Sequence, residues 1–360
     1  MYFIALKCPD FLGGPPLADT KKHILFISFR YGYMIRGNVK EMREEGEERE
    51  SWLDKIDITK YSIKSMIAIP LIILLIAFAV IAYTQFSVGS PVRMGMDFKG
   101  GTMVEVATDE SQEVLTAKFA EYPLVLVGKT GVGNNKRVEF GPMDEPQRNE
   151  LIDLLNDYYG VGTYRMANIS PVFGEQYLKQ ALYAIMLAFT LMAIVVFAVF
   201  RKIIPPSAVV FAAFSDIVIA IACINLIGMT LSLATVAALL MLIGYSVDSN
   251  ILLTANLLRK KGELNEKIRN TMKTGVMMTS TTLTAVLAMF VVSYLIDIPI
   301  LKAISIVLLF GLVMDLLNTW LLNAGVLRWY IEQQEEKKKF VQRGIKKDVT
   351  KAKATKKVKA

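Results

Sequence analysis

The chain has 360 residues, and 53% of them are apolar before its 23 glycines are counted, which exceeds the apolar content of ordinary soluble domains. A single His and two Cys exclude a zinc site, which needs about four such ligands, and exclude a disulfide framework, so we expect no metal and no cofactor. The net charge is +8, and residues 328–360 alone hold 12 Lys or Arg against 4 Asp or Glu. The excess positive charge therefore lies in one tail.

The N-terminal residues 1–64 contain no stretch long enough to cross a membrane. The apolar run at 23–29 is too short, and residues 40–50 are so rich in charge that a solvated helix or a disordered segment is expected. No signal-peptide layout is present. Translation from Met34 or Met42 is an equal alternative, in which case part of this segment is an over-long start.

Six later stretches are long and apolar enough to span a bilayer, which takes about 20 residues at about 1.5 Å per residue. Buried helices of a soluble core are the alternative, but six such runs are too many for one core and the linkers are too short to cover them. The predicted spans are 66–84, 181–200, 206–227, 231–254, 276–296 and 303–327.

The flanking Lys and Arg residues predict the orientation of these spans. The segments on one side carry many basic residues, whereas the short loops on the other side, 228–230 and 297–302, offer only Lys302. Both termini should therefore be cytoplasmic. The expected organisation is a cytoplasmic segment 1–64, a first span 65–84, an extracytoplasmic domain 85–178, five further spans in 179–327 and a basic cytoplasmic tail 328–360.

The segment between the first two spans is mildly acidic, with 8 basic and 13 acidic residues in 85–178. Its pattern predicts the order β-α-β-β-α-β, which is typical of a ferredoxin-like split βαβ domain. GKTGVG at 128–133 superficially looks like a phosphate-binding loop, but its Lys comes too early and no helix follows, so a docking surface is expected instead. The predicted elements are strands 99–107, 123–128, 137–140 and 163–169 and helices 110–121 and 144–159.

Three acidic residues interrupt the spans. Asp216 lies midway along the third span, Asp248 in the fourth and Asp315 near the middle of the sixth. Ionisable groups at membrane depth are costly and point by default to a functional pathway. None of the three has a Lys or Arg in its own span. Together with Asn250, they are candidates either for a proton path or for helix pairing.

The basic tail at 346–360 lacks apolar periodicity and is expected to be disordered. A basic segment next to a membrane is attracted to anionic lipid head groups. Binding to ribosomal RNA is the weaker alternative, and no nucleic-acid partner is expected.

Several motifs together resemble the SecF branch of the SecD/SecF protein-export family, in its archaeal form. GMDFKGGT (95–102) resembles the G-x-D-F-x-G-G-T element of that family and supplies Gly95, Asp97, Phe98, Gly100 and Gly101. The other matching stretches are ISPVFGEQ (169–176), IGYSVDSN (243–250) and the Thr-rich TSTTLTAVLAMFVV (279–292). Their order and spacing hold from about residue 55 to 327.

This resemblance implies a six-helix half bundle of the resistance-nodulation-division (RND) superfamily, paired with SecD around a pseudo-twofold axis in the cell membrane. It also implies a non-enzymatic role in preprotein translocation at the Sec channel, with a link to the proton gradient. Bacterial members carry an Arg after the fourth-span motif, whereas this chain has Thr254 and Asn256 nearby. We therefore carry over only Asp216 and Asp248 as protonatable or helix-pairing sites.

The expected fold class is thus an α-helical polytopic membrane protein with one α+β ferredoxin-like domain between its first two spans. The alternative function is that of a stand-alone RND-type transporter of small hydrophobic substrates. Such transporters usually need about twelve spans, so this chain would have to pair with a copy of itself or with a partner.

Overall fold

A computed structural model describes residues 61–131, 133–259, 262–338 and 340. The predictions for the first 60 residues and for the basic tail from 341 onward lie outside the described residues. Within the described part, six helical stretches have the length and apolar composition needed to cross a membrane, which confirms the six predicted spans.

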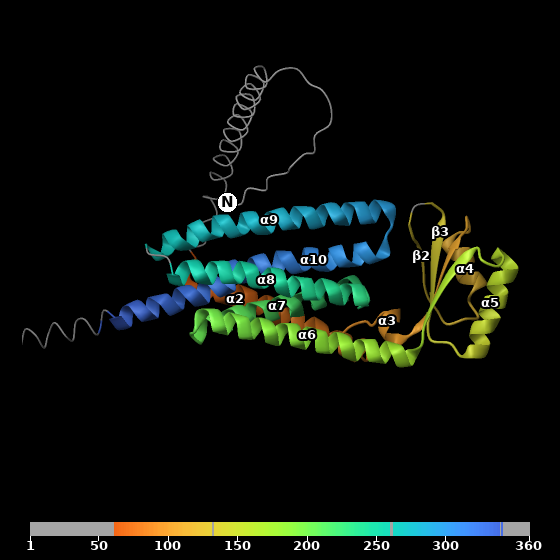
Figure 1. The fold of residues 1–360 in the computed structure, drawn as a ribbon, viewed down its shortest axis with the longest axis horizontal. Coiled ribbons are helices and arrows are strands. Elements are labelled where there is room, and N and C mark those ends of the chain that lie inside the picture. Colours follow the sequence, from red (N-terminus) through yellow and green to blue (C-terminus); the bar gives the residue numbers. More distant parts are fainter. Residues whose placement is uncertain (1–60, 132, 260–261, 339, 341–360) are drawn as a thin grey trace, which may run out of the picture. The chain divides into compact units, whose positions relative to one another are not determined.

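The spanning helices run side by side (Figure 1) and extend beyond the predicted limits because their polar ends continue the helix. The last stretch runs on to Lys338, and a π-helical segment, η2 (Asn318–Asn323), interrupts it. The helices are α2 (Ile63–Val88), α6 (Pro171–Phe200), α7 (Ile204–Ile227), α8 (Leu233–Arg259), α9 (Leu264–Ile296) and α10 (Pro299–Leu317).

The helix ends follow ordinary capping chemistry. The Ser62 hydroxyl accepts a hydrogen bond from the Ser65 N–H at the start of α2, and Gly89 ends that helix with φ 78°. Proline occupies the first turn of α6, α7 and α10, where its missing N–H costs nothing. Local sequence therefore decides where these helices begin and end.

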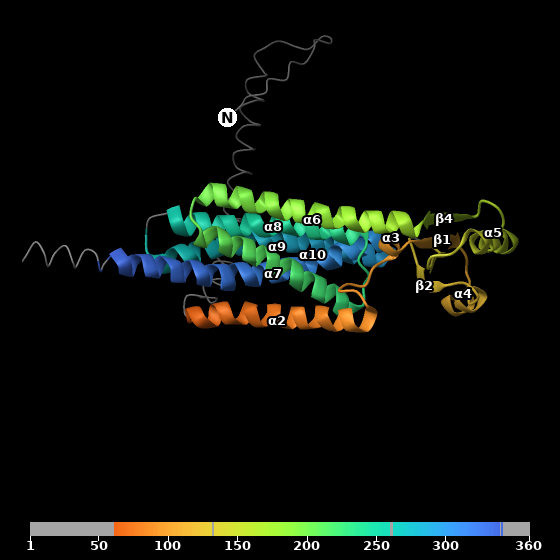
Figure 2. The same cartoon turned by 90° about the horizontal axis from the view of Figure 1, so that it is seen from below.

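The centre of the bundle is α7, whose apolar side chains are buried against α6, α8 and α10. Val209, Ala213 and Ala220 of α7 belong to one cluster with Leu239 and Leu242 of α8. Helix α2 packs on another side of α7 (Figure 2), where Leu74 and Ala77 meet Val218, Ile219 and Ala222. Helix α7 is thus buried by neighbours on several sides, which places its polar residues deep in the protein.

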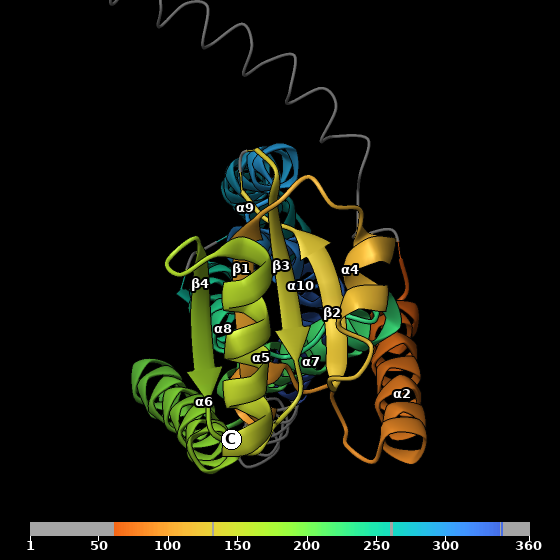
Figure 3. The ribbon, with the colours of Figure 1, turned by 90° about the vertical axis from the view of Figure 1, so that its right-hand side faces the viewer.

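The segment between α2 and α6 forms a four-stranded antiparallel sheet with strand order β2-β3-β1-β4, hereafter the sheet domain (Figure 3). This order, with a helix after β1 and another after β3, confirms the predicted ferredoxin-like topology. The elements are β1 (Gly101–Ala107), α4 (Gln112–Lys118), β2 (Leu124–Lys129), β3 (Asn135–Phe140), α5 (Glu145–Tyr159) and β4 (Tyr164–Ile169).

Alternate strand residues of the sheet domain form its core. Val104 pairs with Val138 on one side and with Met166 on the other, and the two helices cover the same face. Leu115 of α4 and Leu151 of α5 are fully buried there. The alternate apolar side chains of the strands and the apolar stripe of α5 therefore pack into a single layer.

The structure corrects several boundaries of the predicted domain by one to three residues, and two of these corrections have a local cause. The first strand begins at Gly101 rather than 99, because residues 96–99 form a short helix, α3 (Met96–Lys99). The first domain helix starts at Gln112 rather than 110, because Ser111 caps it by accepting a hydrogen bond from the Val114 N–H.

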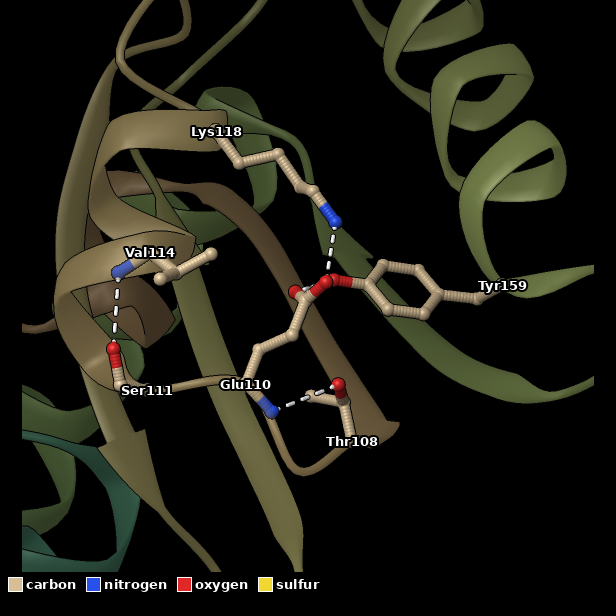
Figure 4. A network of polar contacts seen from close by, with 6 residues as sticks. All are labelled: Thr108, Glu110, Ser111, Val114, Lys118 and Tyr159. Carbon is tan, nitrogen blue, oxygen red and sulfur yellow. Dashed lines mark hydrogen bonds and ion pairs between the residues drawn. The ribbon is translucent and has the colours of Figure 1, made fainter.

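Glu110 lies before α4 rather than in it, and its carboxylate bonds two side chains (Figure 4). Its Oε1 accepts a hydrogen bond from Lys118 Nζ at 2.6 Å and its Oε2 accepts one from the Tyr159 hydroxyl at 2.7 Å. The bond from Lys118, followed by that from Tyr159, lowers the pKa of Glu110, while burial and the bond to Glu110 raise the pKa of Tyr159. The carboxylate thereby ties the end of α4 to the end of α5.

Candidate functional site

Nine polar side chains from α7, α8, α10 and η2 meet inside the bundle, and each is at most 2% exposed. We call this set the polar cluster. Its members are Ser215, Asp216, Ser246, Ser249, Asn250, Asp315, Asn318, Thr319 and Asn323. The structure thus brings together three of the four predicted membrane candidates, Asp216, Asn250 and Asp315.

Asp216 of α7 lies between α8 and η2 and accepts a hydrogen bond from each of them. The Ser246 hydroxyl donates to its Oδ2 at 2.6 Å, and the Asn318 amide donates to its Oδ1 at 2.6 Å. The same amide group lies 3.1 Å from the Ser215 hydroxyl. A buried carboxyl with partners on both oxygens is stabilised where an unpaired one would not be.

Asp315 of α10 is the second carboxyl group of the polar cluster and lies in contact with Asp216. The Ser249 hydroxyl donates to its Oδ2 at 3.1 Å, and the Thr319 hydroxyl donates to its Oδ1 at 3.3 Å. Neighbouring carboxyl groups that are buried in protein repel each other when both are ionised, and they share protons as a pair. The arrangement is therefore chemically suited to hold and release a proton.

A second limb of the polar cluster continues along α8 toward the Arg259 end. The Asn250 amide donates to the Ser246 backbone carbonyl at 2.7 Å, and the Asn323 amide donates to Asn250 Oδ1 at 2.7 Å. Asn323 Oδ1 is buried without a hydrogen-bond partner in the described part of the chain. Polar groups therefore run from the carboxyl pair toward one end of the bundle.

The π-helical segment places several members of the polar cluster. A π-turn holds an extra residue per turn and is frequent at functional sites. Asn318, Thr319 and Asn323 all belong to η2 and are all buried. Sequence reasoning identified Asp216, Asn250 and Asp315 but missed Ser215, Ser249 and Asn323. The spacing of four between Asp315, Thr319 and Asn323 was the signal that could have found the last of these.

Asp248 is apart from the polar cluster. It is exposed on the surface of α8, and no hydrogen bond or ion pair to it occurs among residues 61–131, 133–259 and 262–338. Asp248 therefore does not join the other three candidates inside this chain's own bundle. Its neighbours Ser249 and Asn250 turn inward, because successive residues of a helix are about 100° apart.

Asp248 belongs to a continuous exposed stripe on α8, hereafter the α8 stripe: Ala237, Met241, Gly244, Tyr245 and Asp248. The spacing of three and four residues places them on one face of the helix. Nothing lies within 4 Å of the position that a Cβ on Gly244 would occupy. The α8 stripe is thus an open surface with small residues and one acid at mid-span.

The motif residues near the sheet domain lie at its connection to the bundle. Gly95 bonds Leu231 in the segment before α8, and Asp97 bonds Leu233, the first residue of α8. Phe98 is buried against Ala181 of α6 and Val236 of α8. Gly100 and Gly101 have positive φ of 77° and 146° and lead into β1. The Gly residues therefore provide a backbone path that residues with side chains rarely adopt.

Three hydroxyl groups of the Thr-rich α9 bond carbonyl groups of their own helix. Thr281 and Thr282 donate to the Met278 carbonyl, and Thr284 donates to the Ser280 carbonyl, all within α9. Within the described chain no set of three His, Cys, Asp or Glu residues could hold a metal ion.

Comparison with known proteins places these features in a family. Residues 152–333 match the family model "Protein export membrane protein SecD/SecF, C-terminal", and residues 86–112 match "SecD/SecF GG Motif". A protein-export membrane protein SecF from Methanolacinia petrolearia is 44% identical over 77% of this chain and 97% of its own length. This chain belongs to the SecD/SecF family of protein-export membrane proteins.

Other SecD/SecF relatives give the same result. The SecF of Haloferax volcanii is 41% identical over 78% of this chain and 97% of its own length. The SecF of Pyrococcus furiosus is 42% identical over 76% of this chain and 93% of its own length. The polar cluster, the α8 stripe and the GG motif all lie within the matched family segments.

A solved structure shares the fold. The crystal structure of SecDF from Thermus thermophilus, a translocon-associated membrane protein, is similar with a TM-score of 0.58 at 22% identity. The match covers 74% of this chain but 38% of the SecDF chain, so this chain spans under two fifths of that protein's length. The six-helix bundle with its inserted sheet domain is therefore a fold that SecDF contains as one part.

Proposed function

We propose that this chain is a non-enzymatic accessory subunit of the Sec protein-export machinery, which acts with a SecD-type chain to promote preprotein translocation. The proposal rests on one observation, namely that this member of the SecD/SecF family exposes the α8 stripe, with Asp248 in it, on the surface of its bundle. An Asp at mid-span that faces lipid costs about 2.5–3.5 kcal/mol, so a surface that carries one is expected to face another protein.

The shape and chemistry of the α8 stripe fit a helix of a companion chain. Small residues such as Gly244 and Ala237 let a second helix come close, and polar side chains then bond across the contact. The Asp248 carboxyl group would then bond a polar side chain of that second helix. A companion half that presents an equivalent helix would also complete a twelve-helix assembly.

The proposed placement puts the sheet domain on the far side of the cell membrane and both termini in the cytoplasm. The Arg259 end of α8 and the start of α9 carry basic residues, whereas residues 297–302, from the end of α9 into the first turn of α10, offer Lys302 alone. On the far side the sheet domain would meet emerging preprotein near the translocon channel. The basic residues after the last span would interact with anionic lipids.

Proton coupling is the second part of the proposal. Asp216 and Asp315 form a carboxyl pair with hydroxyl and amide donors around it and no Lys or Arg in the polar cluster. Uptake of a proton removes charge from the pair and changes which donors each oxygen retains. The helices α7, α8 and α10 would then repack around the pair.

Affinity isolation from native membranes tests the pairing. We expect a SecD-type chain at a one-to-one ratio, with or without channel subunits. Gly244→Leu should abolish this recovery, because the added side chain occupies the α8 stripe. The control is Ala285→Leu on the exposed face of α9. Native mass that corresponds to a homodimer would contradict the proposal and favour the stand-alone transporter.

Export measured against an imposed proton gradient tests the coupling. Asp216→Asn keeps a side chain of similar size and one oxygen acceptor, but its neutral amide cannot take up the proton. We expect it to pair normally and to lose the dependence of export rate on the gradient. Export that still rises with the gradient in Asp216→Asn and in Asp315→Asn would refute the proton role while leaving the accessory function intact.

A further inference from the structure

A short backbone ladder connects the GG-motif segment to the loop before α8. We call residues 93–101 the motif strap. The Gly95 N–H donates to the Leu231 carbonyl at 2.8 Å, and the Leu231 N–H donates to the Arg93 carbonyl at 2.6 Å. A Cβ on Gly95 would lie 2.9 Å from that Leu231 oxygen. Close contact of the two backbones therefore needs glycine at this position.

Asp97 extends the ladder onto α8 itself. Its Oδ2 accepts a hydrogen bond from the N–H of Leu233, the first residue of α8, at 2.9 Å. Ser232 and Thr235 bond each other's N–H groups through their hydroxyls. A carboxylate at a helix N-terminus satisfies a free N–H and interacts favourably with the helix dipole. Part of the α8 cap thus comes from a residue 136 positions away in the chain.

The motif strap is also wedged against the start of α6. A Cβ on Gly174 of α6 would lie 2.7 Å from the Phe98 carbonyl oxygen, and one on Gly100 would lie 2.7 Å from Pro171 N. Strand β1 leaves the strap at Gly101, and β4 leads into α6 through Ser170. Two hydrogen-bonded strands of the sheet domain therefore enter the bundle at one closely packed point.

Helix α8 connects that point to the parts of the bundle that matter for function. It supplies Ser246, Ser249 and Asn250 to the polar cluster, and it carries the α8 stripe. A helix is stiff over this length, so displacement of its first turn is transmitted along its axis.

We infer that the motif strap is a mechanical joint between the sheet domain and α8, in which Asp97 is the positioning residue. Through this joint, movement of the sheet domain is coupled to rearrangement of the polar cluster. Its importance for export rests on the proposed function, whereas its effect on α8 does not.

Hydrogen–deuterium exchange of the full chain with its partner in lipid nanodiscs tests the joint. Asp97→Ala removes the acceptor for the Leu233 N–H, and we expect exchange in residues 231–240 to rise about fivefold. Because α8 is a stiff element, exchange in residues 242–250 should rise too. Asp97→Asn keeps an oxygen acceptor and should restore both segments. Asp153→Ala on the exposed face of α5 is the control.

Export by the same variants completes the test. We expect Asp97→Ala to slow export with the partner still bound and Asp97→Asn to restore it. Faster exchange confined to 231–240 with normal export would reduce Asp97 to a local cap and overturn the joint. Restored exchange without restored export in Asp97→Asn would overturn it too. Normal export in cells that lack the chain would refute the proposed function instead, and the exchange data would still decide the joint.

Discussion

At the scale of single residues, the buried carboxyl groups depend on their donors. Asn318 donates both to Asp216 and toward Ser215, so its amide links η2 to α7. When a donor is removed from a buried acceptor, the desolvation cost of that acceptor is no longer compensated.

Asn318→Ala is therefore expected to lower the free energy of unfolding of the bundle by about 1–3 kcal/mol. The measurement is reversible unfolding in mixed micelles, followed by the fluorescence of Trp320. Asn270→Ala on the exposed part of α9 is the matched control and should change little. Equal losses in both variants would show that the Asp216 contact contributes nothing specific.

Glu110 gives a prediction about pH in the sheet domain. Its pKa lies below the ordinary value of 4.5 in the folded chain because Lys118 and Tyr159 bond the carboxylate. Its contribution to stability is therefore complete above pH 4.5 and is lost as the pH falls through the lowered value. In Glu110→Gln this loss should vanish, so amide protection at the end of α5 should depend less on pH below 4.5. An unchanged pH profile would refute the role of Glu110.

Sequence alone identified the acidic residues of the bundle but not the direction in which each one faces. Asp248 and Ser249 are adjacent, yet Asp248 is exposed and Ser249 is buried. Which side of α8 is inside depends on where α7 and α10 pack, and no local pattern encodes that. Asp97 could be recognised as a motif residue, but its bond to Leu233 joins distant segments and needs the folded chain.

At the scale of elements, close contacts between helices and strap depend on glycine. A Cβ on Gly174 would meet backbone atoms of Phe98 and Gly100, which cannot rotate away as a side chain can. Gly244 offers the opposite case, with nothing within 4 Å.

Gly174→Ala should therefore destabilise the chain by about 1–3 kcal/mol, as overpacking does, whereas Gly244→Ala should be neutral or stabilise α8 by up to about 1 kcal/mol. Thermal unfolding of the two purified variants without the partner gives the comparison. A tolerated Gly174→Ala would mean that α6 and the motif strap are not held in close contact.

The six spans and the ferredoxin-like order could be read from sequence because apolar length and strand periodicity are local signals. The short helix α3 could not, because its four residues are fixed by contacts of Phe98 and Gly100 with α6 and α8. The π-helical turn of η2 was not predicted either, and its residues contact α7 and α2, which are distant in the chain.

At the scale of the whole molecule, the α8 stripe predicts opposite effects on the lone chain and on the complex. Asp248→Leu removes a charge that faces lipid when the chain is alone, so the isolated chain should gain about 2.5–3.5 kcal/mol of stability in bilayers. The same change should weaken pairing with the companion chain. Unfolding of the isolated chain and recovery of the complex give the two readouts, and changes of the same sign in both would argue against a paired surface.

The exposed Asp248 has a consequence for the supply of this protein in the cell. A copy that finds no companion keeps an acid in the hydrocarbon layer, and local unfolding of α8 then lets water reach it at low cost. Such orphan copies are favoured targets for proteolysis, since degradation follows the population of opened forms. The amount of this subunit should therefore follow the synthesis of its companion, without any dedicated regulator.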